Sequence, residues 1–372
     1  MIILAAAIIL SLSNSGIISK ANKAKTDSDT ANLKEYVNTL RAEWELMTDV
    51  EQTAAGSFVD YANSKLAEKG YKRELAADGR TVMNEAATAA VKAGIKVGDT
   101  VTGYKLDVAT YTTSGEENTC NSEDGTEANP QPNTVATNPD ITWKYLGVNA
   151  NGEMMIMADL STSVVEANTK VTLGGKGGYL KGPEMLNTIC EKLYSKDGVG
   201  TARSMNIDDV NGILGYTGEK GSYYNSTNES YIPTKETMKI GDTVSQKGES
   251  ALINKTTPDG RDINMYYADY YYINKTTDEK EMTNVGNIEL VYNTKNTYWL
   301  ASSCVGADFY SSLADFYVRF VGSVGVNASG MFHSSDYSDS YAYAVRPVVT
   351  LNSSVSLTKD TTTENTWKIN QM

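Results

Sequence analysis

The spacing of the apolar residues changes near Gly94, and this change constrains the fold more than any other feature of the sequence. Before it, Leu33, Val37 and Leu40 recur at three- and four-residue intervals, which places them on one stripe of a helix. After it, apolar and polar residues alternate and glycines stand at the turns, as in strands. We therefore expect an α+β protein in which a helical N-terminal part precedes a domain of short antiparallel strands and two helices.

The helical part divides into a long N-terminal helix, residues 1–48, and a helical connector, residues 49–93. The connector is rich in alanine, lysine and glutamate, and its apolar residues keep helical spacing. Gly70 and the pair 78–79 interrupt this spacing, so we expect two helices here. The C-terminal domain would then cover residues 94–372.

Two local motifs in the C-terminal part predict defined structure. Apolar-rich runs flank Asn151 and Gly152, a dipeptide that accommodates the positive φ angles of a tight hairpin turn. Asn206 can cap a helix whose first turn contains Asp208 and Asp209, where the helix dipole favours negative charge. We expect a hairpin at the first motif and a short helix at the second, with the two aspartates in structural roles.

A glycine-rich stretch, residues 174–182, invites comparison with phosphate-binding loops. It lacks the Gly-Lys-Ser/Thr ending of that motif, so we expect a flexible loop without a phosphate site. Proline is favoured at the first position of a helix, which predicts that a helix begins at Pro183. Cys190 would lie on the apolar stripe of that helix and would be a core residue.

Residues with catalytic or metal-binding chemistry are scarce. The three cysteines, Cys120, Cys190 and Cys304, lie far apart, and His333 is the single histidine. Zinc sites and redox pairs need short cysteine spacings, and a multi-histidine metal centre is impossible. The triplet Gln-Pro-Asn at 131–133 is similar to the calcium and sugar triplet of C-type lectins, but calcium needs several converging oxygen ligands. We expect no metal, no cofactor and no enzymatic activity.

The chain opens on an apolar run of ten residues, which is too short to cross a bilayer and has no basic region before it. With the polar residues that follow, the stretch ILAAAIILSLSNSGIISKANKAK resembles the N-terminal helix of type IV pilins and pseudopilins, especially those of Gram-positive bacteria. The processing motif of that family is missing, so we expect the true start to lie upstream. An ordinary membrane anchor is the alternative, and both interpretations display the rest of the chain outside the cell.

The C-terminal region lacks three common residue types. Residues 297–358 contain no Lys, Glu or Gln, whereas an even distribution over the 372 residues would place about nine there. Strand propensity explains part of this deficit, but aspartate persists although strands disfavour it strongly. The residues that remain, chiefly Tyr, Ser, Asp, Asn, Ala, Gly and Phe, are those of antibody binding loops. This composition favours a recognition surface over a core.

Several motifs in this region carry a second resemblance. YWLASS at 298–303, FYVRFVGSVG at 316–325 and YAVRPVVTLNS at 343–353 resemble a Gram-positive surface domain of the C-type lectin fold, related to the formylglycine-generating enzyme. The variable proteins of diversity-generating retroelements belong to this group. In them, mutation of template adenines replaces asparagine codons by codons for residues such as Tyr, Ser, Asp, Ala, Phe and His, but never Lys, Glu or Gln. Between residues 304 and 343 only Met331 falls outside the set that such codons can reach.

The resemblance implies a fixed scaffold and a variable surface, with residues 304–343 as the candidate variable region. Its scaffold positions correspond to Trp299, Leu300, Arg319, Phe332, Arg346, Pro347, Val348 and Val349. Its variable, ligand-binding positions correspond to Asp308, Tyr310, Asp315, Phe320, Asn327, Ser329, His333, Asp336, Tyr337, Asp339 and Tyr341. His333 would then be a contact residue, because no partner for proton transfer is evident.

Together these features predict a pilin-like adhesin or receptor, held at the cell surface by a membrane anchor or in a pilus, with an extracellular C-type lectin-like head. Its partner would be a protein, a glycan or a phage or cell-surface ligand, and other pilin subunits could associate with the N-terminal helix. The net charge of −13 argues against nucleic acid. Two alternatives are a structural minor pilin or wall protein without ligand binding, and a formylglycine-type oxidase, whose paired active-site cysteines are missing.

Overall fold

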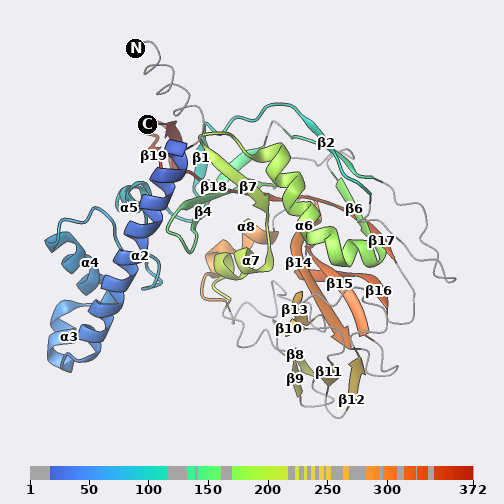
Figure 1. The fold of residues 1–372 in the computed structure, drawn as a ribbon, viewed down its shortest axis with the longest axis horizontal. Helices are drawn as coiled ribbons and strands as arrows, with labels where there is room; N and C mark the ends of the chain where they lie inside the picture. The colour runs from blue at the N-terminus through green and yellow to red at the C-terminus, as the bar shows by residue number, and fades with distance from the viewer. Residues whose placement is uncertain are drawn as a thin grey trace, which may run out of the picture. The chain divides into compact units, whose positions relative to one another are not determined.

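The computed structural model has a mixed α+β fold (Figure 1). It describes residues 17–115, 132–138, 141–160, 170–216, 282–292, 296–307, 314–323, 325–333 and 339–371, together with short strands within 223–267. The chain divides into two compact units: an N-terminal unit, Met1–Ala93 with Val148–Glu153, and a C-terminal unit, Gly94–Gly147 with Met154–Met372. The α+β class predicted from the change in apolar spacing is confirmed.

The N-terminal unit is mainly helical in its described part. Its described helices are α2 (Ile17–Glu45), α3 (Asp49–Ala55), α4 (Phe58–Glu68) and α5 (Glu85–Lys92). The predicted stripe on α2 is confirmed, because Leu33, Val37 and Leu40 are buried in one cluster with Tyr61 and Leu66 of α4. Each such buried apolar side chain contributes about 1.5–3 kcal/mol relative to leaving it exposed.

The connector contains three helices where the sequence pattern predicted two. The Thr48 hydroxyl accepts a hydrogen bond from the backbone N–H of Glu51, and the Glu51 carboxylate accepts one from the backbone N–H of Thr48; Ser57 and Asp60 repeat this reciprocal arrangement. Each capping box satisfies backbone N–H groups that a helix start would otherwise leave unpaired. The two boxes start α3 and α4 only nine residues apart, and apolar spacing alone cannot resolve a break this close.

The predicted hairpin around Asn151 and Gly152 is present. It joins β4 (Thr142–Val148) to β5 (Met154–Asp159), and Gly152 has φ +76°. The tip of this hairpin belongs to the N-terminal unit: the backbone N–H of Asn84 donates to Gly152 O at 2.9 Å, and Lys34 Nζ donates to Ala150 O at 3.2 Å. A Cβ added at Gly152 would collide with the backbone of Val82, so glycine is required there for two reasons.

Two larger sheets form the centre of the C-terminal unit (Figure 1). The first has the order β19-β20-β1-β4-β5-β18-β7. Its other strands are β1 (Thr100–Thr102), β7 (Gly200–Ser204), β18 (Pro347–Leu351), β19 (Val355–Lys359) and β20 (Thr366–Gln371). Strand β18 lies between β5 and β7, and Val348 and Val349 on it are fully buried.

The second sheet carries most of the candidate variable region. Its strands are β6 (Lys170–Gly174), β14 (Tyr298–Ala307), β15 (Ala314–Val321), β16 (Val326–His333) and β17 (Ser340–Ala344), with β10 (Glu236–Met238) and β13 (Ile263–Tyr267) at one side. Three two-stranded pieces complete the described strands: β2 (Thr110–Thr112) with β3 (Thr134–Ala136), β8 (Tyr223–Asn225) with β9 (Ser230–Ile232), and β11 (Thr243–Gln246) with β12 (Glu249–Leu252).

Helix α6 (Gly175–Tyr194) overturns two predictions. The glycine-rich stretch forms its first turns rather than a flexible loop, and Pro183 lies inside the helix rather than at its start. The ring of Tyr179 packs 5.0 Å from that of Phe316 on β15, and a Cβ added at Gly182 would come within 3.1 Å of Leu173 on β6. Glycine thus lets the helix approach the sheet closely, and this packing outweighs the low helix propensity of glycine and proline.

Two shorter helices, α7 (Ile207–Leu214) and α8 (Ile288–Tyr292, preceded by the 3₁₀ turn Val285–Asn287), complete the unit. The predicted cap of α7 is confirmed, because the side chain of Asn206 accepts from the backbone N–H of Asp209. Asp209 also pairs with Arg203 through two contacts of 2.6 Å. Such a bidentate pair is structural, as expected for this aspartate.

Arg346 joins the two sheets. It is 2% exposed, and its guanidinium donates to Ala158 O on β5 at 2.9 Å, to Tyr298 Oη on β14 at 2.9 Å and to Leu290 O on α8 at 2.7 Å. Burying a guanidinium is costly unless its N–H groups are paired, and these acceptors pair all three of its nitrogens. Arg346 therefore fixes β14 and α8 against the first sheet.

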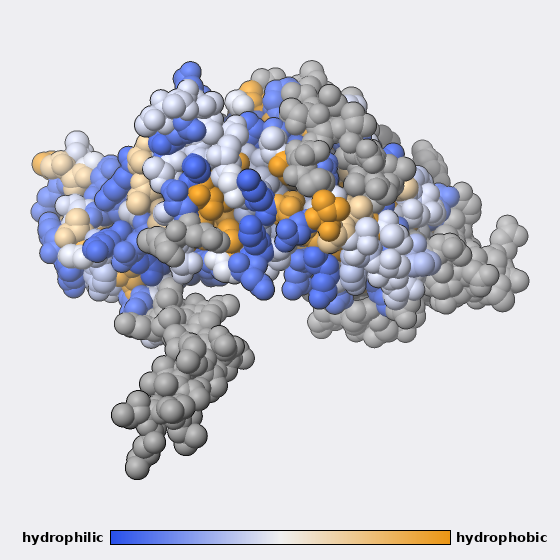
Figure 2. Space-filling view, turned by 90° about the horizontal axis from the view of Figure 1, so that it is seen from above, coloured by the Kyte–Doolittle hydropathy of each residue, from blue (hydrophilic) through white to orange (hydrophobic). Residues whose placement is uncertain are grey.

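None of the helices in the described part of the chain is long and apolar enough to cross a bilayer. The apolar run of residues 1–10, on which the pilin resemblance partly rests, lies outside the described residues. The view in Figure 2 shows a largely hydrophilic surface on which hydrophobic residues form small separate patches.

Candidate ligand-binding surface

Strand pairing brings Trp299, Phe320 and Asn327 into one row across β14, β15 and β16. Phe320 is the register partner of Trp299 on one side and of Asn327 on the other. Side chains alternate between the faces of a strand, so partners in register project from the same face. Ser329, two residues after Asn327, extends this face beside Val318. Two of the predicted site residues, Phe320 and Asn327, therefore lie next to each other.

Tyr343 on β17 is the centre of an aromatic cluster on this face. Its ring centroid lies 4.5 Å from that of Trp299, 4.9 Å from that of Phe320 and 6.2 Å from that of Tyr341. We call these four residues the ring cluster. Aromatic pairs at such distances contribute about 0.5–1.5 kcal/mol each beyond the burial of their area. Phe320, Tyr341 and Tyr343 are half-buried, so the cluster presents ring surface to solvent.

The buried member of the ring cluster is held by the scaffold. Trp299 is fully buried, and its indole N–H donates to Val171 O on β6 at 2.8 Å. Beside it, Ser303 donates its hydroxyl to Tyr179 O of α6 at 3.1 Å. Trp299 therefore forms a rigid base under the exposed rings, because its position and its hydrogen bond are both fixed.

Polar groups surround the rings. Tyr341 Oη donates to a carboxylate oxygen of Asp339 at 3.2 Å, and the hydroxyls of Ser329 and Tyr343 lie 3.3 Å apart. Asp339 is held at both backbone groups, since its N–H donates to Met331 O and its carbonyl accepts from Gly175 N. Ser329 is only 4% exposed, so it can act on a ligand only through Tyr343. Asn327, Asp339 and Tyr341 are half-buried and accessible.

The remaining predicted site residues are placed in part or lie outside the described residues. Asp315 and His333 are register partners at the ends of β15 and β16, which fixes their backbones beside each other. Asp308, Tyr310, Asp336 and Tyr337 lie outside the described part of the chain. The described site thus comprises Phe320, Asn327, Ser329, Asp339 and Tyr341, joined by two residues that the prediction did not include in it, Trp299 and Tyr343.

Most of the predicted scaffold residues are buried. Trp299, Leu300, Val348 and Val349 are fully buried, Arg319 is 3% exposed, and Pro347 is also buried. Phe332 lies on β16. Burial raises the pKa of the Tyr298 phenol, and the nearby Arg346 guanidinium opposes that shift without cancelling it. The scaffold around the ring cluster is therefore buried, and all three guanidinium nitrogens of Arg346 are paired within it.

Other candidate sites of the sequence have structural roles. The side-chain amide of Asn133, from the Gln-Pro-Asn triplet, accepts from Thr172 N at 2.7 Å and donates to Thr172 O at 2.9 Å, so it anchors β6. Cys190 is buried, as expected for a core residue, and burial raises the pKa of its thiol. No group of three His, Cys, Asp or Glu side chains within the described residues could hold a metal ion.

The chain matches no protein-family model, no curated protein and no solved structure.

Proposed function

We propose that the protein is a surface-displayed binding protein whose C-type lectin-like head recognises a ligand through the ring cluster and its polar rim. The observation that carries this proposal is Tyr343, which links a rigid buried indole to two half-exposed rings, Phe320 and Tyr341. Binding hot spots are rich in aromatic residues that are well packed at the base and exposed at the tip. Asn327 and Asp339 supply hydrogen-bonding groups beside the rings.

The same arrangement supports diversification of this surface by a retroelement. Phe320, Asn327 and Tyr341 are half-exposed, whereas their strands are fixed by pairing and by buried neighbours such as Trp299 and Val318. Replacing the exposed side chains would therefore leave the backbone in place. Sequencing the gene across cells of one population tests this: changes should be confined to codons 304–343, and changes spread evenly over the gene would contradict it.

Display through a pilin-like N-terminal helix completes the proposal. The amphipathic half of α2 packs its Leu33–Val37–Leu40 stripe into the N-terminal unit. In pilins, the amphipathic half of the N-terminal helix supports the globular head, so this packing is what the resemblance implies. The apolar half, ahead of α2, would anchor the protein in the membrane or in a filament. The ligand class that we propose is a protein, glycan or phage surface.

Substitution in the ring cluster tests binding. Beads coated with the full-length protein should lose about tenfold or more of their adhesion to target cells when Phe320 and Tyr341 are both replaced by alanine, because hot-spot rings each contribute 2 kcal/mol or more. Tyr71→Ala is the matched control, since Tyr71 is an exposed tyrosine (44%) of the N-terminal unit. Equal adhesion of the double variant and the control would remove the ring cluster as the binding site.

A structural subunit is the second candidate, and one observation favours it. Leu46 and Val50 in the N-terminal unit are 87% and 79% exposed, an apolar pair typical of a contact with another subunit. Replacing both by serine should impair filament assembly and leave bead adhesion unchanged if the protein serves both roles. A purely structural protein would lose assembly in this variant and would show no adhesion in any variant.

A further inference from the structure

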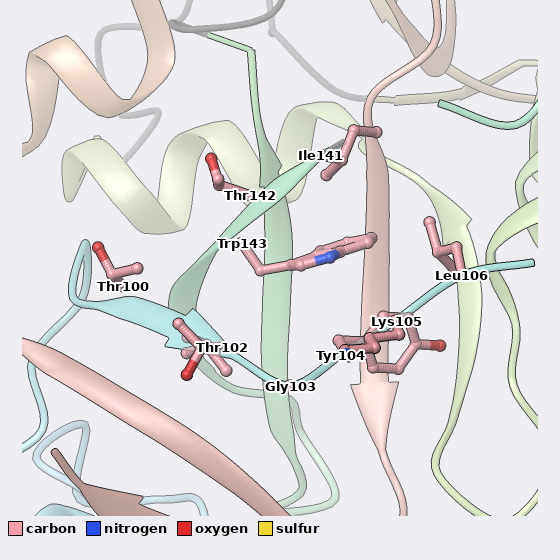
Figure 3. Close-up of a pocket in the computed structure, with 10 residues that line it drawn as sticks. Thr100, Thr102, Gly103, Tyr104, Lys105, Leu106, Ile141, Thr142 and Trp143 are labelled. Atoms are coloured by element: carbon pink, nitrogen blue, oxygen red, sulfur yellow. The ribbon is translucent and has the colours of Figure 1, made fainter. Parts of the chain in front are cut away.

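A groove separate from the ring cluster lies where the chain leaves strand β1 (Figure 3). Gly103, at φ +92°, turns the chain away from β4, and the space between residues 102–106 and the start of β4 stays open. The groove has a volume of about 420 Å³. Small-ligand sites have volumes of about 300–1,000 Å³, so this one is large enough for a small organic molecule.

Trp143 at the base of the groove has an unsatisfied donor. It is 2% exposed, and its indole N–H has no hydrogen-bond partner within the described structure. By contrast, the buried Trp367 donates to Asp99 Oδ2 at 2.9 Å. Leaving a buried donor unpaired costs about 1–3 kcal/mol, so such a group in a folded protein calls for an acceptor that is bound from outside.

The indole nitrogen itself has almost no accessible surface, so an acceptor in the groove reaches it only when the residues that cover it move aside. Figure 3 shows it on the edge of the ring that faces Gly103 and Tyr104, both of which line the groove. Tyr104 packs edge-on against the indole at 5.1 Å, and its own hydroxyl already donates to Tyr194 O at 2.7 Å. Tyr104 therefore contributes ring surface to the groove, and the N–H of Trp143 is an unpaired donor buried at its base.

The charge and polarity of the lining define the acceptor. Lys105 is the charged residue of the lining, which contains no carboxylate, and it is exposed. Leu106 and Ile141 add apolar surface. In a chain of net charge −13, the ammonium group of Lys105 beside these apolar side chains favours an anion with an apolar body.

We propose that this groove binds a small carboxylic acid with an apolar or aromatic body. The carboxylate accepts from the Trp143 indole N–H and pairs with Lys105, and the apolar body lies against Leu106 and Ile141. Charge-assisted hydrogen bonds of this kind are about twice as strong as neutral ones, which favours a carboxylate over an amide of the same shape. This site is independent of the ring cluster and of the binding function proposed for it.

Indole NMR on the full-length protein tests the proposal with benzoate as the probe. Labelling with ¹⁵N-tryptophan gives one N–H peak for each of the four tryptophans, and Trp143→Phe assigns the peak of Trp143. Benzoate should shift that peak saturably, and benzamide, the neutral analogue of equal shape, should shift it at much higher concentration. Tryptophan is donor-only at this atom, so the shift reports directly on the acceptor.

Lys105→Gln provides the second arm, because Lys105 is exposed and its loss should not affect folding even if Trp143→Phe does. We expect it to weaken benzoate binding roughly fivefold, the upper range for an exposed ion pair. Lys359→Gln, an exposed lysine on β19, is the matched control and should bind as the unmodified protein does. A peak that does not move, or that moves equally with benzoate and benzamide and in both lysine variants, would mean that only an ordered water satisfies Trp143 and would overturn the proposal.

Discussion

Strands β17 and β18 follow each other in the chain and have five residues each, yet they meet opposite demands. Strand β18 pairs with β5 and β7, and four of its five residues are buried. Strand β17 pairs with β6 and touches β14 at a single position, so its tyrosines stay half-exposed and Ser340 and Ala342 are exposed. A central strand fixes its residue types through packing on both sides, whereas β17 leaves one face open to change.

Arg346, the second of the two residues between the strands, makes this contrast possible. Arg346 reaches β5, β14 and α8 at once, so the start of β18 is fixed independently of what β17 carries. Side chains on β17 can therefore differ without altering how β18 enters the first sheet. Without these hydrogen bonds of Arg346, changes on β17 would alter the position of β18, and the contrast between the two strands would be lost.

The largest effect should come from Arg346→Met. Methionine leaves Ala158 O, Leu290 O and the Tyr298 hydroxyl without their donors, so the free energy of unfolding should fall by about 3–5 kcal/mol. Urea unfolding followed by tryptophan fluorescence measures this. Lys359→Met removes an exposed cation and should change the stability by no more than about 0.5 kcal/mol. A loss in the Arg346 variant no larger than in this control would show that β17 and β18 are fixed by strand pairing alone.

A smaller effect should appear at alkaline pH. Burial raises the pKa of Tyr298, opposed by Arg346, and burial raises the pKa of Tyr145 to about 12. Tyrosines of the unfolded chain ionise near pH 10. A raised folded-state pKa stabilises the fold fully below the unfolded value, and this stability is lost as the pH rises through the folded value. Stability measured between about pH 9 and 12 should therefore fall, and less steeply in Tyr145→Phe; an identical slope would argue against a buried phenol at that site.

The smallest effect should come from Tyr343→Phe. This change keeps the ring that contacts Trp299 and Phe320 but removes the hydroxyl near Ser329, so stability should fall by about 0.5–1.5 kcal/mol. Tyr341→Phe, which loses a bond to the half-buried Asp339 rather than to the buried Ser329, should cost less. Thermal unfolding of the two variants provides the comparison. If Tyr341→Phe proved the more costly of the two, the assignment of Tyr343 as the centre of the ring cluster would be wrong.

Features that depend on a few adjacent residues could be predicted from the sequence. The hairpin at Asn151–Gly152 requires a turn dipeptide, and the start of α7 requires the Asn206 cap; both signals are local. The stripe of α2 was equally visible, because helical spacing repeats over several turns. The capping boxes at Thr48 and Ser57 are also local signals, and together they indicate two helix starts, which accounts for the third helix of the connector.

Features that depend on residues far apart in the chain could not be predicted from the sequence. The first turns of α6 are helical because Tyr179 packs on Phe316 and Gly182 on Leu173, and no local pattern of glycines indicates those partners. Tyr343 lies in the candidate variable region but was not among the predicted ligand-binding positions, because its contacts come from the distant strands β14 and β15. The alternating tyrosines of residues 340–344 were the one sign that its ring shares a face with that of Tyr341.

The hairpin tip that belongs to the N-terminal unit has a mechanical consequence. Because residues 148–153 are counted with that unit, the chain crosses the boundary between the units three times, once after Ala93 and once at each side of the tip. Tension applied to α2 would reach the first sheet through the ends of β4 and β5 as well as through Gly94. Three parallel paths share a load that a single linker would carry alone, and two of them end on neighbouring strands in the middle of the sheet. A pull on the N-terminal helix would therefore load β4 and β5 together, two strands that are held by pairing on both sides.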